Sequence, residues 1–427
     1  MSPQKTLEEI WKIYPCKGAD IYWAGFWSES KRNGFVLTDI RIFLNTKTNN
    51  TFHPESVKLQ NPKIKEETEE KILATISKEQ IIIEPKEFNL IGVSKRPLVS
   101  IIIPTYNRKN MVTTAIDSAL NQSYINIEVI IIDDGSTDGT DDIIQEKYKN
   151  NTKVKYLWKA NGGVGSALNA GIKMSNGELI AWLSSDDFYD LENNKLIELS
   201  VKEHIKNKNV GLTYTDYRVH WIDAGNVSET TSVLPKTRQE QLDEIIRVCY
   251  INGSTTVIKK EVFYTIGMFN ENLKYAQDHE MWMRIVGHYK IQNIHGFLLN
   301  YSQGKHQRDG GECAHGCRIE SEISRERSRL LFEKNRPVVC AMICMKDEEA
   351  LVEQCLSDLI FYVDKIVIFD DGSTDKTPEL IKKYPKVIDY FYSPNKGNVR
   401  TEGKDRQELL KMAQKTKSDW ILFIDPD

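Results

Sequence analysis

A repeated segment constrains the fold of this chain more than any other feature of its sequence. Val129–Tyr148 and Ile366–Pro385 share the core DDGSTD, displaced by 237 residues. In each copy an apolar run precedes this core, and an earlier apolar run, Val99–Ile103 or Val338–Cys344, leads into a polar turn. The order of strand, turn, helix and strand predicts a βαβ opening in each copy, and therefore an α/β fold with a parallel sheet.

The alternation of predicted strands and helices continues through the first copy. After Asn110, apolar residues recur with the spacing of one helical face, at Val112, Ala115, Ile116, Ala119 and Leu120. A further strand, helix and strand are predicted at Val154–Leu157, Gly163–Met174 and Leu179–Leu183. Each predicted helix can therefore cover a sheet whose strands run in parallel.

Polar or acidic residues follow three of these predicted strands. They are Pro104–Arg108 after the first, Asp133 and Asp134 after the second, and Asp186 and Asp187 after the last. A single aspartate after a strand is more simply a turn residue or a helix cap, and Ser136–Asp138 is expected to cap the helix that follows it. Three such strand ends in register instead indicate a ligand site, because open α/β sheets bind ligands at that edge.

Composition narrows the classes of function. The 57 Lys and Arg residues and 61 Asp and Glu residues give a formal charge of −4, which offers no general attraction for nucleic acid. The longest apolar runs fall well short of the roughly 20 residues of a membrane helix, and the amino terminus is polar. Seven cysteines fit reduced thiols better than a disulfide framework. We expect a soluble cytoplasmic protein.

The stretch from Val99 to about Tyr301 resembles an inverting glycosyltransferase of family 2, which has the GT-A fold. The segments that carry the resemblance are VSIIIPTYNR at Val99–Arg108, DDGSTDGT at Asp133–Thr140, NGGVGSALNAGI at Asn161–Ile172, WLSSDDFY at Trp182–Tyr189 and QDHEMWMRI at Gln277–Ile285. A Rossmann dehydrogenase is excluded, because the glycines after Asn161 lack the G-x-G-x-x-G spacing and do not lie in the first βα turn.

The resemblance implies a role for each matching residue. Residues expected to bind the nucleotide-sugar are Pro104, Thr105, Tyr106, Arg108, Asp133, Asp134, Asn161, Gly163 and Asp186. Asp186 and Asp187 would hold Mn²⁺ or Mg²⁺, and His306, which follows Tyr301, is either a further metal ligand or a surface histidine. Asp278 would be the general base, kept ionised by the dipole of the helix that it begins.

The chemistry of sugar transfer explains these residue types. A divalent cation held by carboxylates neutralises the charge that develops on the leaving diphosphate, and hard cations suit oxygen ligands. The acceptor hydroxyl needs a base, and in-line attack with a single base inverts the anomeric carbon. The expected activity is metal-dependent transfer from a UDP-sugar to a glycan or a lipid-linked glycan, in synthesis of bacterial cell-surface polysaccharide. Such an acceptor would bring the chain to the periphery of a membrane.

Two positions depart from the family pattern. Ser184 stands where the acidic motif commonly begins with Asp, and Leu168 stands where the Asn-Gly loop often carries an Arg. Asp186 and Asp187 are therefore left to hold the metal, and one cationic partner of the diphosphate is missing. Cys313, His315 and Cys317 are a weak zinc signal, because no second cysteine pair accompanies them.

The second copy resembles the nucleotide half of the same family. It contains VDKIVIFDDGSTDKT at Val363–Thr377 and WILFIDPD at Trp420–Asp427, where Asp425 and Asp427 form its own acidic motif. No acceptor half follows, so we expect a partial second GT-A domain in which Trp420–Ile424 is an inner strand. The expected domains are an N-terminal region of unassigned role at 1–96, a catalytic domain at 97–334 and the partial domain at 335–427. The alternative to an enzyme is a module that binds nucleotide-sugar for regulation.

Overall fold

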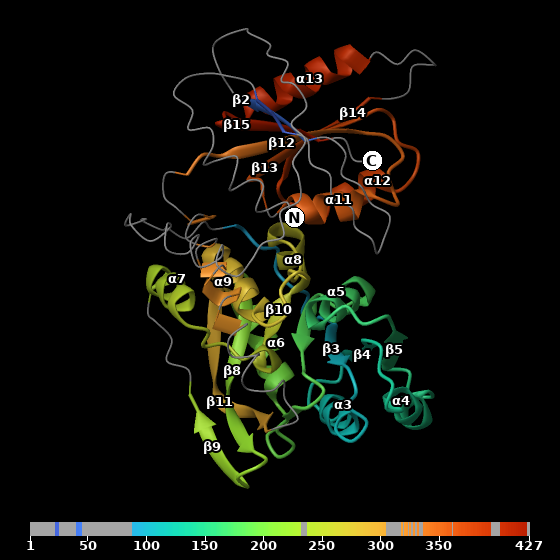
Figure 1. The fold of residues 1–427 in the computed structure, drawn as a ribbon, viewed down its shortest axis with the longest axis vertical. Coiled ribbons are helices and arrows are strands. Elements are labelled where there is room, and N and C mark those ends of the chain that lie inside the picture. The colour runs from blue at the N-terminus through green and yellow to red at the C-terminus, as the bar shows by residue number, and fades with distance from the viewer. Residues whose placement is uncertain are drawn as a thin grey trace, which may run out of the picture. The chain divides into compact units, whose positions relative to one another are not determined.

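The computed structural model divides the chain into two compact units. The first unit comprises residues 76–334, and the second joins 1–75 to 335–427 (Figure 1). The described residues are 88–231, 237–304, 336–360, 362–393 and 402–424, the strand residues 22–24 and 40–44, and the helical residues within 317–332 other than 319, 323, 326, 327, 329 and 330.

The first unit is built on a mixed sheet of nine described strands in the order β5-β4-β3-β6-β10-β8-β11-β7, with β9 beside β8. These strands are β3 (Val99–Thr105), β4 (Ile127–Asp133), β5 (Val154–Trp158), β6 (Leu179–Trp182), β7 (Phe188–Tyr189), β8 (Val210–Trp221), β9 (Asn226–Thr230), β10 (Val257–Lys259) and β11 (Lys290–Gln303). The strands β5, β4, β3 and β6 run in parallel, and β10 pairs antiparallel with β6. The predicted α/β class, with a parallel nucleotide half, is confirmed.

Helices cover both faces of this sheet. They are α3 (Val112–Leu120), α4 (Thr140–Tyr148), α5 (Val164–Met174), α6 (Leu196–Lys206), α7 (Arg238–Arg247), α8 (Lys260–Ile266) and α9 (Gln277–His288), with a short 3₁₀ turn at Gly253–Thr255. Figure 1 shows α3 and α4 on one side of the parallel strands and α5 on the other. Successive strand residues serve opposite faces: Ile101 and Ile103 pack in the core with α3, whereas Ile102 packs in the core with α5.

The local predictions for the first copy hold, with one refinement. The predicted face of α3 is buried at Val112, Ala115, Ile116 and Ala119. At the start of α4 the N-cap residue is Gly139, and Asp138 Oδ1 accepts the Thr140 N–H at 3.0 Å. Asp138 thus bonds the first turn as expected, but Ser136 does not. Its hydroxyl is used by the neighbouring loop instead.

The second unit contains a sheet of six described strands in the order β1-β2-β15-β12-β13-β14. Its elements are β1 (Tyr22–Ala24), β2 (Ile40–Leu44), β12 (Val339–Met345), α11 (Val352–Leu359), β13 (Lys365–Asp370), α12 (Thr377–Ile381), β14 (Val387–Tyr392), α13 (Glu402–Lys415) and β15 (Trp420–Ile424). The strands β15, β12, β13 and β14 are parallel, as β6, β3, β4 and β5 are in the first unit. The predicted inner position of Trp420–Ile424 is confirmed, and its outer neighbour is the antiparallel strand β2.

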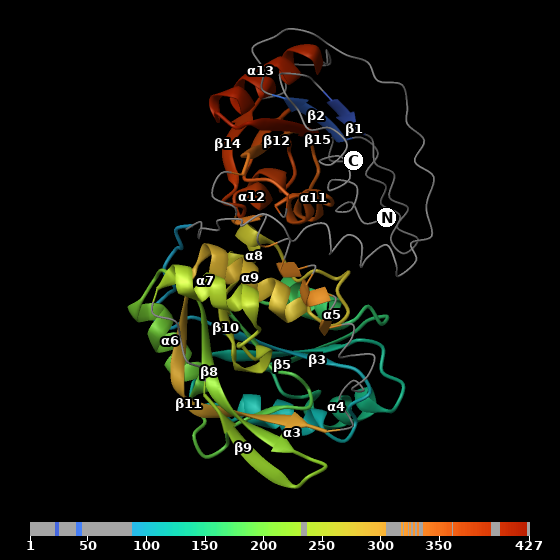
Figure 2. The ribbon, with the colours of Figure 1, turned by 60° about the vertical axis from the view of Figure 1, so that its left-hand side comes forward.

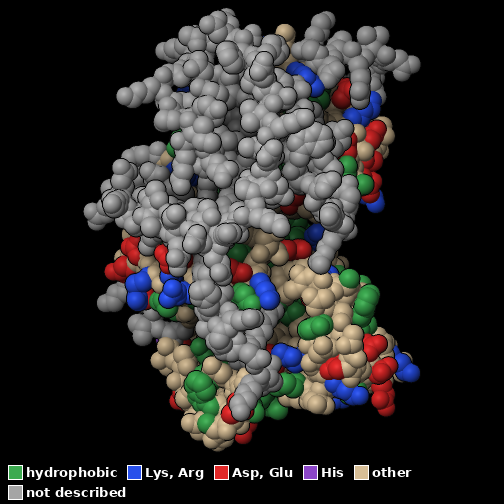
Figure 3. Space-filling model, viewed as in Figure 1, with side chains coloured by type: hydrophobic (Ala, Val, Ile, Leu, Met, Phe, Trp, Pro, Cys, Tyr) green, Lys and Arg blue, Asp and Glu red, His purple; other side chains and the backbone are tan. Residues whose placement is uncertain are grey.

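The described surface of the first unit has no single sign of charge on the face shown in Figure 3, where acidic and basic side chains lie together over α4 and α7. A hairpin of β8 and β9 extends from the edge of the unit (Figure 2). Among the described residues, no helix combines the length and the apolar character needed to cross a membrane.

Candidate active site

The loops that leave β3 and β4 are tied to each other by hydrogen bonds. The Asn107 N–H donates to Ser136 Oγ, and Asn107 Oδ1 accepts the Thr137 N–H, both at 2.9 Å. The Arg108 N–H donates to Thr140 Oγ1 at 3.0 Å. Asn107 has a φ of 52°, a left-handed conformation that asparagine adopts more readily than most residues. The two polar strand ends are therefore held together as one surface.

Asp133, the last residue of β4, is buried and used on both of its oxygens. Oδ1 accepts the Ser136 N–H at 2.8 Å, and Oδ2 accepts the Tyr156 hydroxyl at 3.0 Å. Burial raises the pKa of the Tyr156 phenol, and the bond to Asp133 raises it further. Asp133 thus forms hydrogen bonds both with the turn after β4 and with a side chain of the neighbouring strand β5.

Asp134 organises the glycine-rich loop that precedes α5. Lys159 Nζ donates to Asp134 Oδ1 at 2.6 Å, the Gly162 N–H donates to the same oxygen at 3.0 Å, and the Gly163 N–H donates to Oδ2 at 2.8 Å. These bonds place Gly163 beside the predicted nucleotide residues, and Asn161 is exposed in the same loop. Asp134 is therefore a carboxylate that the protein holds in one orientation.

Arg108 and Asp186 connect the ends of β3 and β6. Arg108 Nη2 lies 3.7 Å from Asp186 Oδ2, and both side chains are partly exposed, at 25% and 14%. Leu168, where the family often has an arginine, is buried in the core. Arg108 is thus the cation that the described structure places next to the Asp186 carboxylate.

Asp187 points into the protein rather than toward Arg108. Its Oδ2 accepts the Ser254 hydroxyl at 2.6 Å, and its Oδ1 accepts the Ser302 N–H at 3.0 Å. Burial and the neighbouring Asp186 carboxylate raise the pKa of Asp187 well above its usual range. Ser254 Oγ also accepts the Ser184 N–H at 3.1 Å. Asp187 therefore fixes the loop between β6 and β7, residues 183–187, which we call the acidic loop. Asp186 is the more accessible carboxylate of the pair.

Asp278 lies in the first turn of α9, two residues after the N-cap residue Ala276. Its Oδ1 accepts the His279 N–H at 2.7 Å. Burial raises the pKa of this carboxyl group, and the hydrogen bond from the His279 N–H lowers it by less, so its ionisation by the helix dipole stays a prediction. Desolvation here outweighs the hydrogen bond, and a raised pKa is what a general base needs to take a proton near neutral pH.

One short segment links Asp278 to the acidic loop. Desolvation by the surrounding protein raises the pKa of the Cys249 thiol, and the nearby Asp278 carboxylate raises that pKa further. Five residues later, Ser254 donates to Asp187. Burial also raises the pKa of Tyr217, and Cys249 and Asp187 contribute to that shift. Residues 249–254 thus include Cys249, whose pKa the Asp278 carboxylate raises, and Ser254, which bonds Asp187.

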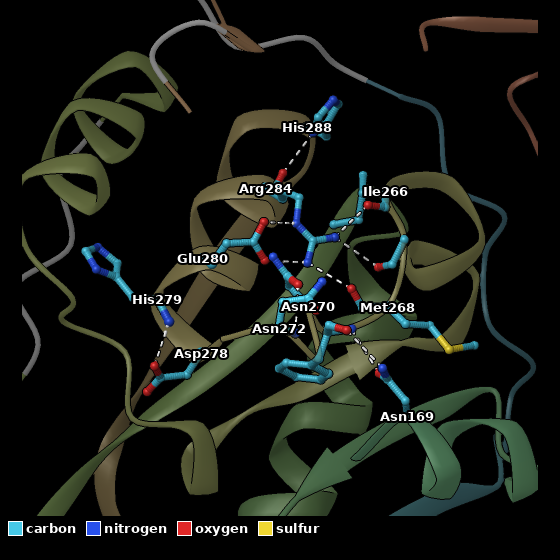
Figure 4. Close-up of polar contacts among 12 residues, drawn as sticks. Asn169, Ile266, Met268, Asn270, Asn272, Asp278, His279, Glu280, Arg284 and His288 are labelled. Atoms are coloured by element: carbon cyan, nitrogen blue, oxygen red, sulfur yellow. Dashed lines mark hydrogen bonds and ion pairs between the residues drawn. The ribbon is translucent and has the colours of Figure 1, made fainter. Parts of the chain in front are cut away.

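Glu280, two residues beyond Asp278, belongs to the framework of α9 (Figure 4). Arg284 binds it through two bonds, Nε to Oε1 at 2.8 Å and Nη2 to Oε2 at 2.7 Å, and both side chains are at most 4% exposed. Arg284 also donates to the backbone carbonyls of Ile266, Gly267 and Met268 at the end of α8. Glu280 is therefore engaged in an ion pair and is not placed to replace Asp278 as a base.

The remaining predicted residues differ in position. Pro104 is buried in β3, and Thr105 is buried with a hydroxyl that has no hydrogen-bond partner in the described part of the chain. Tyr106 is 47% exposed beside them. His306, Cys313 and His315 lie outside the described residues. Among the residues that are described, no three His, Cys, Asp or Glu side chains form a metal-binding cluster.

The second unit repeats the loop contacts of the first. The Asp347 N–H donates to Ser373 Oγ at 2.8 Å, and Asp347 Oδ1 accepts the Thr374 N–H at 2.6 Å. Asp370 accepts the Ser373 N–H at 2.7 Å and the Tyr390 hydroxyl at 2.6 Å. Asp347 has a φ of 53°, close to that of Asn107. Residues 425–427, its expected acidic motif, lie outside the described residues.

The side chains that border these loops are not repeated. Thr105 pairs with Asp133 in the first sheet, and Met345 pairs with the equivalent Asp370 in the second, which also aligns Val99 with Val339. The N–H of Lys159 donates to the carbonyl of Asp133, as the N–H of Ser393 does to that of Asp370. By this correspondence Thr105, Tyr106, Arg108 and Lys159 are replaced by Met345, Lys346, Glu348 and Ser393. The position of the Arg108 cation thus carries an acid in the second unit.

Sequence reasoning missed residues that hold the site from a distance. Lys159 follows β5 directly, so the rule that identified the other strand ends would have found it. Ser254 had no such signal, because the fold brings it to Asp187 across 67 residues. Glu320 likewise reaches the backbone before α9 from more than 40 residues away.

The sequence of this chain is similar to those of known proteins. An uncharacterized glycosyltransferase of Rickettsia felis is 33% identical over 382 residues, which are 78% of this chain and 61% of that protein. The hyaluronan synthase of Pasteurella multocida is 34% identical over 209 residues, which are 47% of this chain and 20% of that protein. The chain thus spans about three fifths of the length of the Rickettsia relative.

One solved structure, S. aureus TarS 1–349 in complex with UDP-GlcNAc, aligns with a TM-score of 0.40 and 22% identity, over 55% of this chain and 71% of that one. The sequence profile of the family described as Glycosyl transferase family 2 matches residues 100–266 and 340–427, which are more than half of the chain and fall in both units. The chain belongs to glycosyl transferase family 2.

Proposed function

We propose that the first unit transfers a sugar from a UDP-sugar to a hydroxyl group, with inversion at the anomeric carbon and with the help of a divalent cation. The observation that carries the proposal is that residues 249–254 adjoin both groups: Cys249 is near enough to Asp278 for that carboxylate to raise the pKa of its thiol, and Ser254 donates to Asp187. Asp278 as the proposed base, and Asp186 with Asp187 as the proposed carboxylate site for the donor, belong to the same unit. A module that only binds nucleotide needs no such base.

The donor would bind across the ends of β3, β4 and β6. Tyr106 offers an exposed ring beside the buried Thr105 hydroxyl, and Asp134 offers a fixed carboxylate to the base or ribose. Arg108 is positioned to take the diphosphate charge, which compensates for the missing cation at Leu168. A bound diphosphate would give Arg108 a second anionic partner besides Asp186.

The carboxylate chemistry of Asp186 fits Mn²⁺ or Mg²⁺. Magnesium in particular is bound through one or two protein carboxylates together with phosphate oxygens, so a large protein cluster is not required. Asp186 would hold the ion and Asp187 would support the loop behind it. When bound, such a cation supplies charge neutralisation at the leaving diphosphate. His306 remains a proposed further ligand.

Asp278 would accept the proton of the acceptor hydroxyl as that oxygen attacks the anomeric carbon. Its raised pKa makes it a stronger base than an exposed aspartate, and its hydrogen bond from the His279 N–H fixes the orientation of the carboxylate. The match to a hyaluronan synthase supports a glycan acceptor and a role in bacterial surface polysaccharide. A lipid-linked glycan acceptor would carry the reaction to the membrane surface.

The test is UDP release from a panel of UDP-sugars, with water and with glycan acceptors, in Mg²⁺, Mn²⁺ or chelator. We expect metal-dependent release that Asp186→Asn lowers strongly. Asp117→Asn, which removes a surface partner of Lys147, is the matched control and should behave as wild type. Equal release with metal, with chelator and in Asp186→Asn would disprove the metal assignment.

A further inference from the structure

The helix that carries Asp278 begins without a capping side chain of its own. The N-cap residue of α9 is Ala276, and no side chain at that position accepts a hydrogen bond from the first turn. Helix starts normally need acceptors for their free N–H groups. The backbone just before α9 therefore requires an acceptor from another part of the chain.

Glu320 supplies that acceptor. Its Oε1 accepts the Lys274 N–H at 2.9 Å, and its Oε2 accepts the Tyr275 N–H at 2.7 Å and the Ala276 N–H at 2.9 Å. Hydrogen bonds from N–H groups to an ionised carboxylate are among the stronger ones in proteins, and a helix N-terminus favours an anion. One side chain thus holds three consecutive residues that end two positions before Asp278.

The segment that carries Glu320 is itself fixed to α9. Ser321 Oγ lies 3.4 Å from His279 Nδ1. Farther along, Phe332 is fully buried against Gly287, where an added Cβ would lie 1.9 Å from Phe332 Cζ. Only glycine leaves room for that ring, so two described residues that follow Glu320, Ser321 and Phe332, contact α9.

We propose that Glu320 is a positioning residue for Asp278, an inference that rests on the proposed function. The ion pair of Glu280 and Arg284 joins the first turn of α9 to the next, and Glu320 fixes the backbone ahead of the first turn. Asp278 lies between these two attachments. Loss of the Glu320 bonds would let the first turn fray and would move the base away from the acceptor hydroxyl.

The test compares Glu320→Ala, Glu320→Gln and Glu322→Gln in the full chain. Glu320→Ala should lower kcat by about 10²-fold, the scale on which small misplacements act. The KM for the UDP-sugar with the fastest release, and the affinity for UDP, should stay close to wild type. Glu320→Gln should recover part of kcat, because its amide oxygen still accepts N–H bonds. Glu322, which pairs with Arg325 on the same segment, is the control and should tolerate the change.

Hydrogen exchange at the amides of residues 274–276 gives a readout that needs no turnover. These amides should exchange at least about tenfold faster in Glu320→Ala than in wild type. Wild-type exchange rates in that variant would show that Glu320 does not hold these amides, and would overturn the inference even for a chain that released no UDP. Faster exchange with unchanged kcat in both Glu320 variants would show that Glu320 holds these amides but does not position the base. That result would also overturn the inference.

Discussion

Asp278 carries opposing influences in one carboxyl group. Burial raises its pKa, and the His279 N–H and its place at a helix start act in the opposite direction. Because its pKa in the folded protein is above that of the unfolded chain, the ionised form costs stability at pH values above the folded pKa. The ionised form of Asp278, which can accept a proton, is therefore the form in which the folded protein is less stable.

Asp278→Asn should separate catalysis from folding. We expect transfer to fall by about 10²-fold or more, the scale of general base catalysis, with UDP affinity retained. In wild type, kcat should rise with pH through a pKa above the ordinary aspartate range, and this acid limb should vanish in the variant. Thermal unfolding at neutral pH should show a variant at least as stable as wild type. A retained acid limb would assign the titration to another group.

Glu280→Gln should give the reverse pattern. It leaves the Arg284 guanidinium buried with an incomplete partner, and breaking a buried ion pair costs about 3–5 kcal/mol. Denaturant unfolding should therefore show a large loss of stability. At temperatures where the variant stays folded, the acid limb of the kcat profile should match wild type. A profile without that limb would make Glu280 the base.

At the scale of elements, the loop after β6 assigns different tasks to neighbouring carboxylates. Asp187→Ala leaves the Ser302 N–H and the Ser254 hydroxyl without their acceptor, and should cost about 1–3 kcal/mol in unfolding measurements. Asp186→Ala loses only a partly exposed contact and should cost at most about 1 kcal/mol. Metal-enhanced UDP binding, followed by calorimetry, should be lost in Asp186→Ala. Equal unfolding costs for the two variants would contradict this division.

Strands, helices and their order were predictable because they depend on local periodicity. The buried run of β3 and the apolar face of α3 are both explicit in the sequence. The common edge of Asp133 and Asp186 followed from the same order, since parallel strands end on one side of the sheet. The inward turn of Asp187 and the reach of Glu320 depend instead on contacts between distant residues, which no local pattern records.

The whole molecule contains two versions of one nucleotide half, and we expect transfer by this chain to depend on the first. Asp186→Asn should lower transfer strongly, whereas Asp370→Asn or Asp371→Asn should leave it nearly intact. UDP release by each purified variant measures this. Activity that survives the Asp186 change but is lost with the Asp370 change would reverse the roles of the two units.

The loop contacts that the units share suggest a history of duplication followed by divergence. The bonds that shape the loops, such as those of Ser136 and Ser373, are retained, while Arg108 and Glu348 have opposite charges at corresponding positions. The two units thus share the hydrogen bonds that shape these loops and differ in the side chains that border them. The two copies are consequently not interchangeable. A chimera with the second pair of loops in the first unit would carry the acid Glu348 where Arg108 lies near Asp186.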